Sequence, residues 1–505
     1  FSTRMNTQEQ LTDDYSTVSS TSNHEYYDQE EAVVVLVTPY STGCCVAREI
    51  AKKGHYKIIC LWNRDFCDNM KQHVPKSCQG LTYHAVMTES DTIEETIEAL
   101  HQAANGLPIV SVICGGEAGV DLTDKLSEEM GLLSNGTQIA NRRDKKVQQE
   151  IIHEAGIRSC RQAGGSKLSE VDDFLKKESY PLIVKPGDSA GSDGVKLCHS
   201  YEEARDHFIY LTEEHQLVNG GGTCDEVLCQ EFLQGREYVV DQVSLNGEHK
   251  VMMVWVYDKR PANGGSFVYF GDIPIESDTP EAQQLIPYAR QVLDALGVKH
   301  GPSHGEFILT KDGPCLVEMN CRCHGGDGIW ERMIAGMTGG YNQVLGTVAC
   351  FLDKDQFHKF PAQPGKFQTH GQCVDMVSFS EGIIKSTPGY DRIRNLPSFV
   401  HLESSYGPGK MVHKTVDMIT DIGSLIVMHS DPKILAEDVA IIRSLEKSNA
   451  MFEYETGDTP TLIKKHLSLE DDFVALERKL SDAMQPSMYL ERKLSIPREP
   501  RDMYM

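Results

Sequence analysis

The chain lacks several features that would assign it to large classes of protein. No apolar run approaches the roughly 20 residues of a membrane-spanning helix, so we expect no contact with a membrane. Lys and Arg total 49 against 74 Asp and Glu, and the formal net charge of −25 argues against a nucleic-acid partner bound through bulk electrostatics. The 15 cysteines include no CxxC pair, and no secretory apolar segment precedes them, which favours reduced thiols in an intracellular, cytoplasmic setting.

The glycine fingerprint of a dinucleotide-binding domain is also missing. Apolar runs at 33–37, 56–62 and 109–114 alternate with helical patterns, which predicts a Rossmann-like parallel sheet with a binding crevice at its strand ends. TPYSTG and GGEAG, which follow two of these strands, do not form GxGxxG, so we do not expect NAD. Glu117, within GGEAG, is either a polar anchor for a substrate amine or an ordinary acid at a helix N-terminus.

The chain does have oxygen ligands gathered on one predicted hairpin. Glu306 lies in the apolar run EFIL, Glu318 and Asn320 lie in CLVEMN, and TKDGP between them is typical of a turn. If 309 faces 315 across the turn, then 306 faces 318, and the two-residue period of a strand puts Asn320 on the same face. The opposite face would enter the core with Phe307, Leu309, Val317 and Met319.

Two carboxylates this close would repel each other without a cation between them. Hard oxygen ligands favour Mg²⁺, which usually arrives with phosphates. Two alternatives stay open. One is an exposed hairpin edge with ordinary acids, and the other is a zinc site of Cys321, Cys323 and His324, which lacks a second, spaced half-site.

Two stretches upstream could meet those phosphates. The apolar run YPLIVKP, 180–186, predicts a strand with Lys185 at its end, and the loop GDSAGSDGV, 187–195, can turn several backbone N–H groups toward an anion. Many surface turns look like this loop, but directly after a strand-end lysine it predicts a phosphate lid. An amphipathic helix from 141 carries basic residues at its head and, on one side, Val147, Ile151 and Ile152.

A broken pair of strands is predicted next. EVLCQEF ends in a break at Gln234–Gly235, and Asn246–Gly247 predicts a hairpin turn. Unpaired main-chain groups at the break could read the edge of a purine, and Glu237 could hold ribose hydroxyls, the alternative being a plain antiparallel hairpin. Arg260 and the glycine pair that follows it predict a mobile loop in the GGSF–GDIP segment.

Taken together and in this order, Lys145, the VKP around Lys185, the GSxG loop, QEFLQGRE and the E…ExN pair resemble the ATP-grasp superfamily over roughly residues 30–455. GPSHGEF, EMNCR before a glycine pair, and GGEAGVDL…GLLSNG are similar to the branch that contains L-amino-acid ligases, dapdiamide synthetase and carnosine synthase. The resemblance implies a multidomain α/β and α+β fold, in which a Rossmann-like pre-ATP-grasp domain precedes the ATP-grasp domain.

Motif placement then gives the expected organisation. A polar tail, 1–31, has too few aliphatic residues to order itself. An N-terminal α/β domain, a lid subdomain, a large subdomain with the Mg/ATP site, a β-rich C-terminal subdomain and a charged helical tail are expected at 32–140, 141–230, 231–365, 366–456 and 457–505. Helices are predicted at 279–296 and, behind the metal site, at 328–352.

The resemblance implies an ATP site with these parts. Lys145 and Lys185 would neutralise the α- and β-phosphates, main-chain groups of Glu231 and Leu233 would meet adenine, and Glu237 would bind ribose. The lid residues expected over the triphosphate are Ser189, Gly191, Ser192 and Gly194.

The resemblance also implies a reaction. Glu306, Glu318 and Asn320 would hold two Mg²⁺ ions, for which Mn²⁺ could substitute. A substrate carboxylate would take the γ-phosphate of ATP, and an amine would then displace phosphate from the acyl phosphate to form an amide. Arg322 would supply positive charge around the transferring group. His304 would orient the acceptor or move a proton, unless it is a hydrogen-bonded histidine without chemistry.

The sequence says less about the substrate-binding residues than about the ATP site. Cys321 and Cys323 replace the Pro and aliphatic residues often found around the arginine, so we do not expect the second pocket of a standard dipeptide ligase. A bicarbonate-using carboxylase and a non-catalytic ATP-binding regulatory protein stay open as alternatives. The expected partners are small-molecule carboxylates and amines, and the sequence is compatible with a homodimer. Residues assigned to the substrate site are Glu117, Arg260, Gly325 and Gly326.

Overall fold

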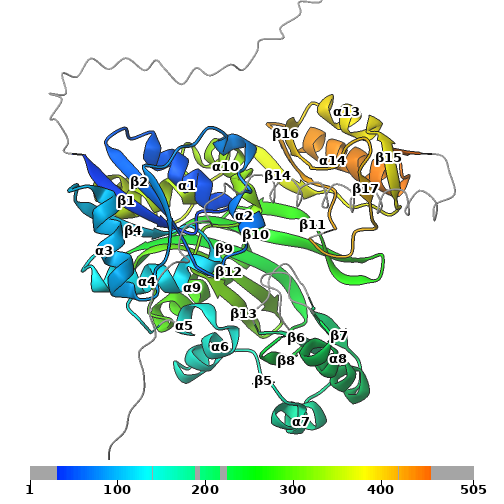
Figure 1. Ribbon diagram of the computed structural model, residues 1–505. Coiled ribbons are helices and arrows are strands. Elements are labelled where there is room, and N and C mark those ends of the chain that lie inside the picture. The colour runs from blue at the N-terminus through cyan, green and yellow to red at the C-terminus, as the bar shows by residue number, and fades with distance from the viewer. Residues whose placement is uncertain (1–30, 139, 188–193, 216–223, 419, 456–505) are drawn as a thin grey trace, which may run out of the picture.

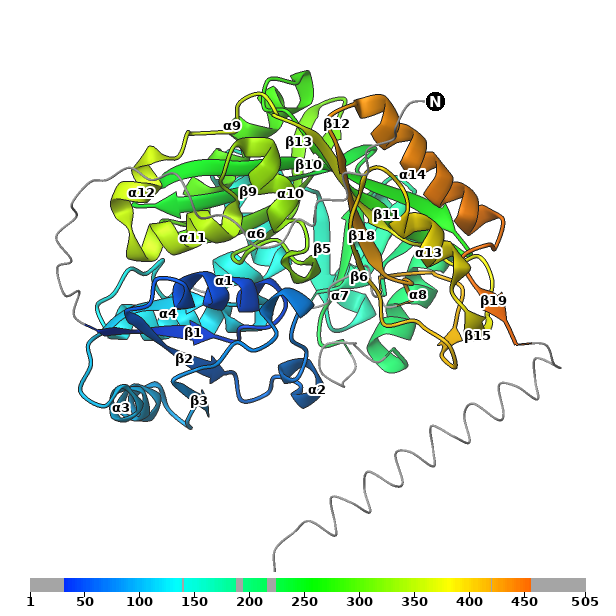
Figure 2. The ribbon, with the colours of Figure 1, turned by 90° about the horizontal axis from the view of Figure 1, so that it is seen from above.

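The computed structural model describes residues 31–138, 140–187, 194–215, 224–418 and 420–455. The tails predicted at 1–31 and 457–505 lie outside this part of the chain, apart from Glu31. A long antiparallel sheet occupies the centre, with the N-terminal domain on one side and the C-terminal elements on the other (Figures 1 and 2). None of the described helices combines the length and apolar character that a membrane span requires.

The N-terminal domain is the predicted parallel sheet. Its four strands run in the order β3-β2-β1-β4, and all three neighbouring pairs are parallel. β1 is buried along its whole length, as expected for a strand with helices on both faces. Helix α1 packs on one face, and α3 and α4 pack on the other. The bounds are β1 Ala32–Val37, β2 Tyr56–Trp62, β3 Ala85–Thr88, β4 Ile109–Cys114, α1 Thr42–Ala51, α3 Ile93–Ala104 and α4 Val120–Glu129, with the short α2 Asp68–Lys71, η1 Lys76–Cys78 and η2 Glu117–Gly119 between them.

A smaller antiparallel sheet follows, in the order β5-β8-β6-β7. Helices α7 and α8 supply its core. The single helix predicted from 141 is divided at Asp144, whose carboxylate accepts the N–H groups of Lys146 and Val147 and so caps the second piece. The bounds are α5 Ala140–Arg143, α6 Lys145–Glu154, β5 Gln162–Gly165, α7 Leu168–Lys177, β6 Leu182–Pro186, β7 Lys196–Cys198, α8 Tyr201–Glu213 and β8 Val227–Glu231.

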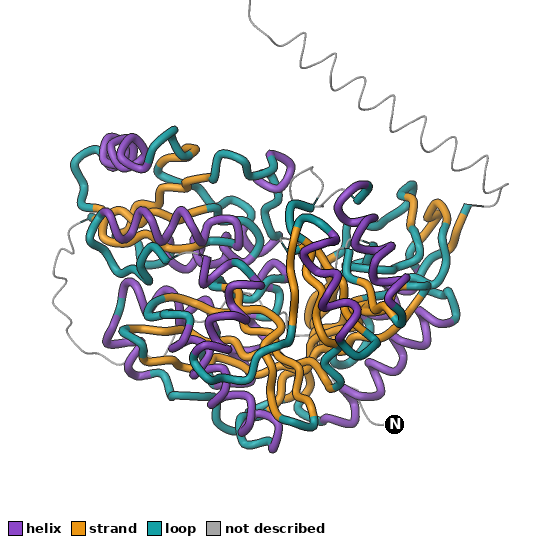
Figure 3. The backbone as a smooth tube through the Cα atoms, turned by 90° about the horizontal axis from the view of Figure 1, so that it is seen from below, coloured by secondary structure: helices purple, strands orange, loops and turns teal. Residues whose placement is uncertain are grey.

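The central sheet has eight strands in the order β13-β12-β9-β10-β11-β14-β18-β16. One face packs against α9, and the other packs against α10 and α11, so helices flank the strands in Figure 3. The predicted turn at Asn246–Gly247 is confirmed, with positive φ at both residues. The bounds are β9 Gly235–Leu245, β10 Glu248–Ala262, β11 Gly265–Ile275, α9 Pro280–Ala295, β12 Gly301–Thr310, β13 Gly313–Asn320, η3 Gly326–Gly328, α10 Glu331–Thr338, α11 Gln343–Leu352, α12 Lys354–Lys359, β14 His370–Asp375, β16 Phe399–Glu403 and β18 Ser424–His429.

Two local predictions were wrong. The segment expected to be a mobile loop near Arg260 is the hairpin of β10 and β11, whose register shifts on both sides of Arg260. The side chain of Asn263 at its tip donates hydrogen bonds to the carbonyls of Ser378 and Thr415. The single helix predicted at 328–352 is two helices, because the left-handed Gly339 ends α10.

The C-terminal segment contributes strands to two sheets. β14, β18 and β16 continue the central sheet beyond β11. A three-stranded sheet and two helices complete the segment around their own core. Their bounds are β15 Gly382–Ser386, β17 Met411–Val412, β19 Glu453–Tyr454, α13 Pro388–Arg394 and α14 Pro432–Lys447.

Candidate active site

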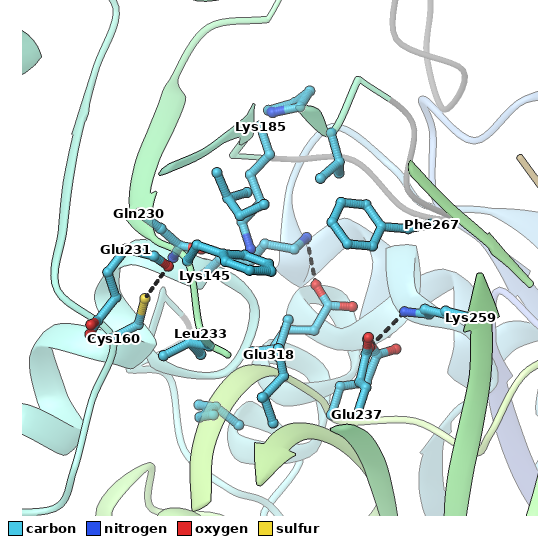
Figure 4. A pocket seen from close by; sticks show the side chains of 18 of the residues that line it. Lys145, Cys160, Lys185, Gln230, Glu231, Leu233, Glu237, Lys259, Phe267 and Glu318 are labelled. Carbon is cyan, nitrogen blue, oxygen red and sulfur yellow. Dashed lines mark hydrogen bonds and ion pairs between the residues drawn. The ribbon is translucent and has the colours of Figure 1, made fainter. Parts of the chain in front are cut away.

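A pocket of about 150 Å³, open to solvent, lies between the small sheet and the central sheet. β6 and β8 form one wall, and the ends of β9 to β13 form the other. Glu237, Lys259 and Glu318 lie toward one end together with Phe267, and Cys160 and Leu233 lie toward the other end beside Gln230 and Glu231 (Figure 4). The charged and polar residues that line the pocket include Lys145, Lys185, Gln230, Glu231, Glu237, Lys259, Glu306 and Glu318.

The β12–β13 hairpin places two carboxylates opposite each other, as predicted. Glu306 pairs with Glu318, but 309 pairs with 314 rather than with 315. The turn is one residue tighter than expected, and a bulge at Val317 restores the predicted register. As a consequence, Leu316 rather than Val317 joins the core, and Val317 lines the pocket.

Two glutamines contact the outer edge of β13, which pairs with no further strand in the described part of the chain. The Gln148 amide donates to the carbonyl of Met319 at 2.7 Å and accepts its N–H at 2.8 Å. The Gln149 amide donates to the carbonyl of Leu316 at 2.8 Å. These contacts fix α6 against the hairpin, so that Lys145 at the start of α6 reaches Glu318, with 3.0 Å from Nζ to Oε2.

The two predicted phosphate-binding lysines point into the same charged end of the pocket (Figure 4). Burial and the neighbouring Lys145 lower the pKa of Lys185. Burial opposes ionisation of Glu318, but Lys145 holds the pKa of this carboxyl below its usual range. The lysines and the carboxylate therefore compensate one another's charge.

Lys259 is a third cation here, and sequence reasoning missed it. Its Nζ lies 2.6 Å from Oε1 of Glu237 and between the rings of Tyr257 and Tyr269, 4.8 and 4.3 Å from their centroids. Burial alone would favour the neutral amine, but Glu237 raises the pKa of Lys259 well above its usual value. The signal was the alternation of Tyr257 and Lys259 along β10, which puts the amine on the face of a mostly buried strand.

The opposite end of the pocket is apolar and suits a flat ring. Leu233 is buried there, and the main-chain N–H of Glu231 donates to the carbonyl of Arg161. The Glu231 carboxylate pairs with the Arg161 guanidinium at 2.7 Å. Apolar contacts come from Cys160, Ile183, Phe232, Leu233, Ile308 and Leu316.

The structure describes only part of the predicted glycine-rich lid, 187–195. Ser189, Gly191 and Ser192 lie outside the described residues. Gly194 has φ of +70°, and its carbonyl lies 2.8 Å from Nε2 of His207, while the next residue, Val195, lines the pocket.

Arg322 lies beside the pocket, where the N-terminal domain meets the central sheet. Its Nε is 3.3 Å from Oε2 of Glu117, which follows β4. Burial disfavours the charge, but Glu117 and Tyr40 keep the pKa of Arg322 above its usual value. Burial raises the pKa of Glu117 itself, although Arg322 opposes this. The strand end of the parallel sheet thus delivers a carboxylate to the predicted catalytic arginine.

The remaining substrate residues are dispersed. The side chain of Arg260 is half-exposed, pairs with Asp258 at 2.7 Å and does not line the pocket. The carbonyl of Gly325 accepts from Thr42 and Trp330. Gly326 has φ of +69° at the start of η3. These glycines join the loop after Arg322 to the N-terminal domain.

His304 is buried and hydrogen-bonded on both ring nitrogens, the arrangement of a histidine without direct chemistry. Nδ1 lies 2.8 Å from Asp241, and Nε2 lies 3.3 Å from Glu306 and 3.1 Å from the Tyr257 hydroxyl. His324 also bonds Asp241, at 2.9 Å. Burial opposes its charge, but Asp241 raises the pKa of His324 to about 10.

The zinc alternative does not assemble among the described residues. Cys321 lies in the core beneath α9, and Cys323 lies in the core beneath α10, where its thiol contacts Thr347. The nitrogen Nδ1 of His324 is occupied by Asp241. The oxygen set on the hairpin fits a hard divalent cation better. The carboxylates of Glu306 and Glu318 face each other and are compensated by lysine amines, as expected of a site built around added positive charge.

Comparisons with known proteins agree with this geometry. Residues 178–331 match the family model described as an ATP-grasp domain. The chain is 28% identical over 355 residues to dapdiamide A synthase of Enterobacter agglomerans, covering 69% of this chain and 82% of that protein. It is 24% identical over 397 residues to alanine–anticapsin ligase of Bacillus subtilis strain 168, covering 71% and 81%.

Among solved structures, the L-amino acid ligase from Bacillus licheniformis superposes with a TM-score of 0.64 at 18% identity, covering 85% of this chain and all of that one. This likeness shows the shared fold, and the expected multidomain α/β and α+β architecture is confirmed. The segment that builds the pocket therefore contains an ATP-grasp domain, and the chain as a whole is similar to ATP-grasp ligases in sequence and in fold.

Proposed function

We propose that this protein is an ATP-dependent carboxylate–amine ligase that forms an amide between small molecules, with amino acids as substrates. The observation that carries the proposal is the pocket between two antiparallel sheets, in which Lys145, Lys185 and the Glu306–Glu318 pair converge. Relatives named as a dapdiamide synthase and an alanine–anticapsin ligase support this choice of reaction and substrate class.

ATP would lie along the pocket with its two ends in different surroundings. The apolar end suits adenine, where the carbonyl of Glu231 and the N–H of Leu233 would meet the ring edge. Lys145 and Lys185 would then face the phosphates from the other end. Glu237 would reach the ribose, with Lys259 beside it compensating the carboxylate.

The charged end would also hold divalent metal. Glu306, Glu318 and Asn320 present carboxylate and amide oxygens, the ligand types that Mg²⁺ prefers, and we assign two Mg²⁺ ions to them, replaceable by Mn²⁺. When bound, such ions offset the negative charge of the phosphates during transfer.

The first step would activate the acid. A carboxylate oxygen of the substrate attacks the γ-phosphorus of ATP, the bond from that phosphorus to the β,γ-bridging oxygen breaks, and ADP leaves with the electron pair. The product is an acyl phosphate, whose leaving group is phosphate instead of oxide. Arg322 is buried beside the pocket and would stabilise the negative charge that develops on the acyl and phosphoryl oxygens.

The second step would form the amide. The amine nitrogen attacks the acyl carbon, the carbon–oxygen bond to phosphate breaks, and the nitrogen loses a proton to the released phosphate or to solvent. Glu117 is the carboxylate best placed to orient a substrate ammonium group, because Arg322 holds it at the edge of the pocket. Closure around the pocket would keep water from the acyl phosphate.

The test is a search for coupled turnover and product. Purified protein is incubated with ATP, Mg²⁺ and pairs of amino acids whose carboxylates carry ¹⁸O, and ADP, phosphate and new masses are measured. Ligation predicts ADP release that requires both amino acids, an amide product, and one ¹⁸O atom transferred to phosphate. A requirement for bicarbonate, or nucleotide binding without any turnover, would overturn the proposal.

A further inference from the structure

We propose that Asp241 and His304 form a positioning pair that orients Glu306 for metal binding, without either residue touching the substrate. The inference rests on the proposed function for the role of Glu306, and its test is arranged to separate the two. It gives a role to a buried group on β9 that no motif in the sequence pointed to.

Asp241 is the centre of the arrangement. It is 1% exposed, and its Oδ1 and Oδ2 lie 2.8 Å from Nδ1 of His304 and 2.9 Å from Nδ1 of His324. The indole N–H of Trp255 donates to Oδ2 at 2.5 Å. Because an ionised carboxylate can only accept, both Nδ1 atoms carry hydrogen, and each ring presents its Nε2 away from Asp241.

His304 is the residue through which Asp241 affects the proposed metal-binding carboxylate of Glu306. It is 2% exposed, and its Nε2 lies 3.3 Å from Oε1 of Glu306. The ring is therefore held between two carboxylates. With a hydrogen on Nδ1, Nε2 can accept from the Tyr257 hydroxyl, 3.1 Å away. The ring meets Oε1 of Glu306 by contact and so limits the rotation of that carboxylate, which leaves Oε2 to turn toward the pocket and toward Glu318, its partner across the hairpin.

His324 binds the second carboxylate oxygen of Asp241. Its ring meets the edge of the His304 ring, with centroids 4.4 Å apart, and its main-chain N–H donates to Gln343 at 2.7 Å. The buried imidazolium offsets the charge of Asp241, which would otherwise be an uncompensated anion in the core. Asp241 can therefore stay ionised and accept the hydrogen of His304.

The same three residues do not make a metal site of their own. Their potential ligand atoms lie within 4.8 Å of one another, which would suit an ion. Both carboxylate oxygens, however, are already hydrogen-bond acceptors for ring nitrogens at 2.8 and 2.9 Å, and the indole adds a third donor. Hydrogen bonds satisfy the cluster, so it acts on the pocket through the neighbours of His304, which are Glu306 and Tyr257.

The test measures metal binding directly, without requiring turnover. Mn²⁺ is titrated into the protein saturated with ADP, and free Mn²⁺ is followed by electron paramagnetic resonance. Loss of an outer partner of a metal ligand typically weakens metal affinity by about 10–100-fold, so His304→Ala should raise the half-saturating Mn²⁺ concentration by about tenfold or more. The dissociation constant of ADP without metal should change by less than about twofold, because His304 does not line the pocket.

Two further variants separate positioning from a loss of folding. Asp241→Asn should raise the Mn²⁺ requirement similarly, and the double variant should be no worse than the more affected single variant, because both act through one contact. His249→Gln is the matched control. His249 is a buried histidine of the same sheet, bonded to Ser244 and Asp294, and its loss should leave Mn²⁺ binding unchanged whatever it does to the melting temperature.

The outcomes distinguish the two proposals. Wild-type Mn²⁺ affinity in folded His304→Ala, or fully additive effects of the two substitutions, would overturn the positioning role alone. A wild-type protein that binds Mn²⁺ with ADP but never joins amino acids would overturn the proposed reaction and leave the positioning role standing. A wild-type protein that binds no Mn²⁺ with ADP would overturn the positioning role together with the metal site.

Discussion

The two faces of the central sheet are built from the same strands but carry opposite chemistry. Toward α9, neighbouring strands present Tyr238, Val240 and Phe307, which are buried in an apolar cluster. On the opposite face, the alternating positions carry Glu237, Glu306 and Lys259, which line the pocket, and Asp241 and His304, which are buried beside it. Successive residues of one strand thus serve stability on one face and chemistry on the other.

The difference teaches how a buried charge cluster can exist in a stable domain. Isolated charges in a core are strongly unfavourable, so the polar face depends on pairing, such as Lys259 with Glu237 and Lys145 with Glu318. The apolar face supplies the free energy that keeps these strands in register. Substitutions on the two faces should therefore separate activity from stability.

The largest effect is expected for Glu318→Gln on the polar face. The substitution removes one of two facing carboxylates and the charge that compensates Lys145, so turnover should fall by at least about a hundredfold. ADP release would be measured beside a thermal melt, with Asp312→Asn in the exposed turn of the same hairpin as control. Near-normal turnover in the Gln variant would remove Glu318 from the metal site.

The apolar face should show the opposite behaviour. Phe307 is fully buried against α9, one residue from Glu306, and Phe307→Ala should lower the free energy of unfolding by about 3–5 kcal/mol. Turnover per folded molecule should stay within about twofold, because the side chain points away from the pocket. Urea unfolding measures the first quantity and initial rates the second. Loss of activity without loss of stability would contradict the division between the faces.

The sequence predicted more of the hairpin than of its surroundings. Periodicity placed Glu306 opposite Glu318, although the real pairing combines a tighter turn with a bulge at Val317, and these offset each other. Asp241 could not be assigned, because its partners lie on other strands and nothing in the local pattern points to it. Lys259 carried only the weak signal of its alternation with Tyr257, and its partner Glu237 also lies on another strand. No role was assigned to Gln148 in the predicted amphipathic helix, and only its contact with Met319, 171 residues away, gives it one.

The position of the polar face should depend on the contact between Gln148 of α6 and Met319 at the edge of β13. Gln148→Leu leaves the buried N–H and carbonyl of Met319 without partners and should cost about 2–4 kcal/mol of unfolding free energy. Because α6 also carries Lys145, ATP affinity should fall too, in contrast to Phe307→Ala. Glu150→Leu, exposed on the same helix, is the control. Equal ATP affinity in Gln148→Leu and wild type would show that the hairpin holds its position without α6.

The smallest effect concerns how the polar face responds to pH. Burial and Lys145 lower the pKa of Lys185, so this amine should lose its proton at a less alkaline pH than an ordinary lysine. Protonated Lys185 attracts phosphate and neutral Lys185 does not, so the affinity for ADP should decline as pH rises from neutral toward that lowered pKa. Calorimetric titration of ADP across this range measures the slope, and Lys185→Arg should flatten it, because guanidinium keeps its charge. A slope that is the same in both proteins would assign the pH dependence to another group. Phe307→Ala removes no titrating group, so its unfolding should show the same pH profile as wild type, displaced by a constant.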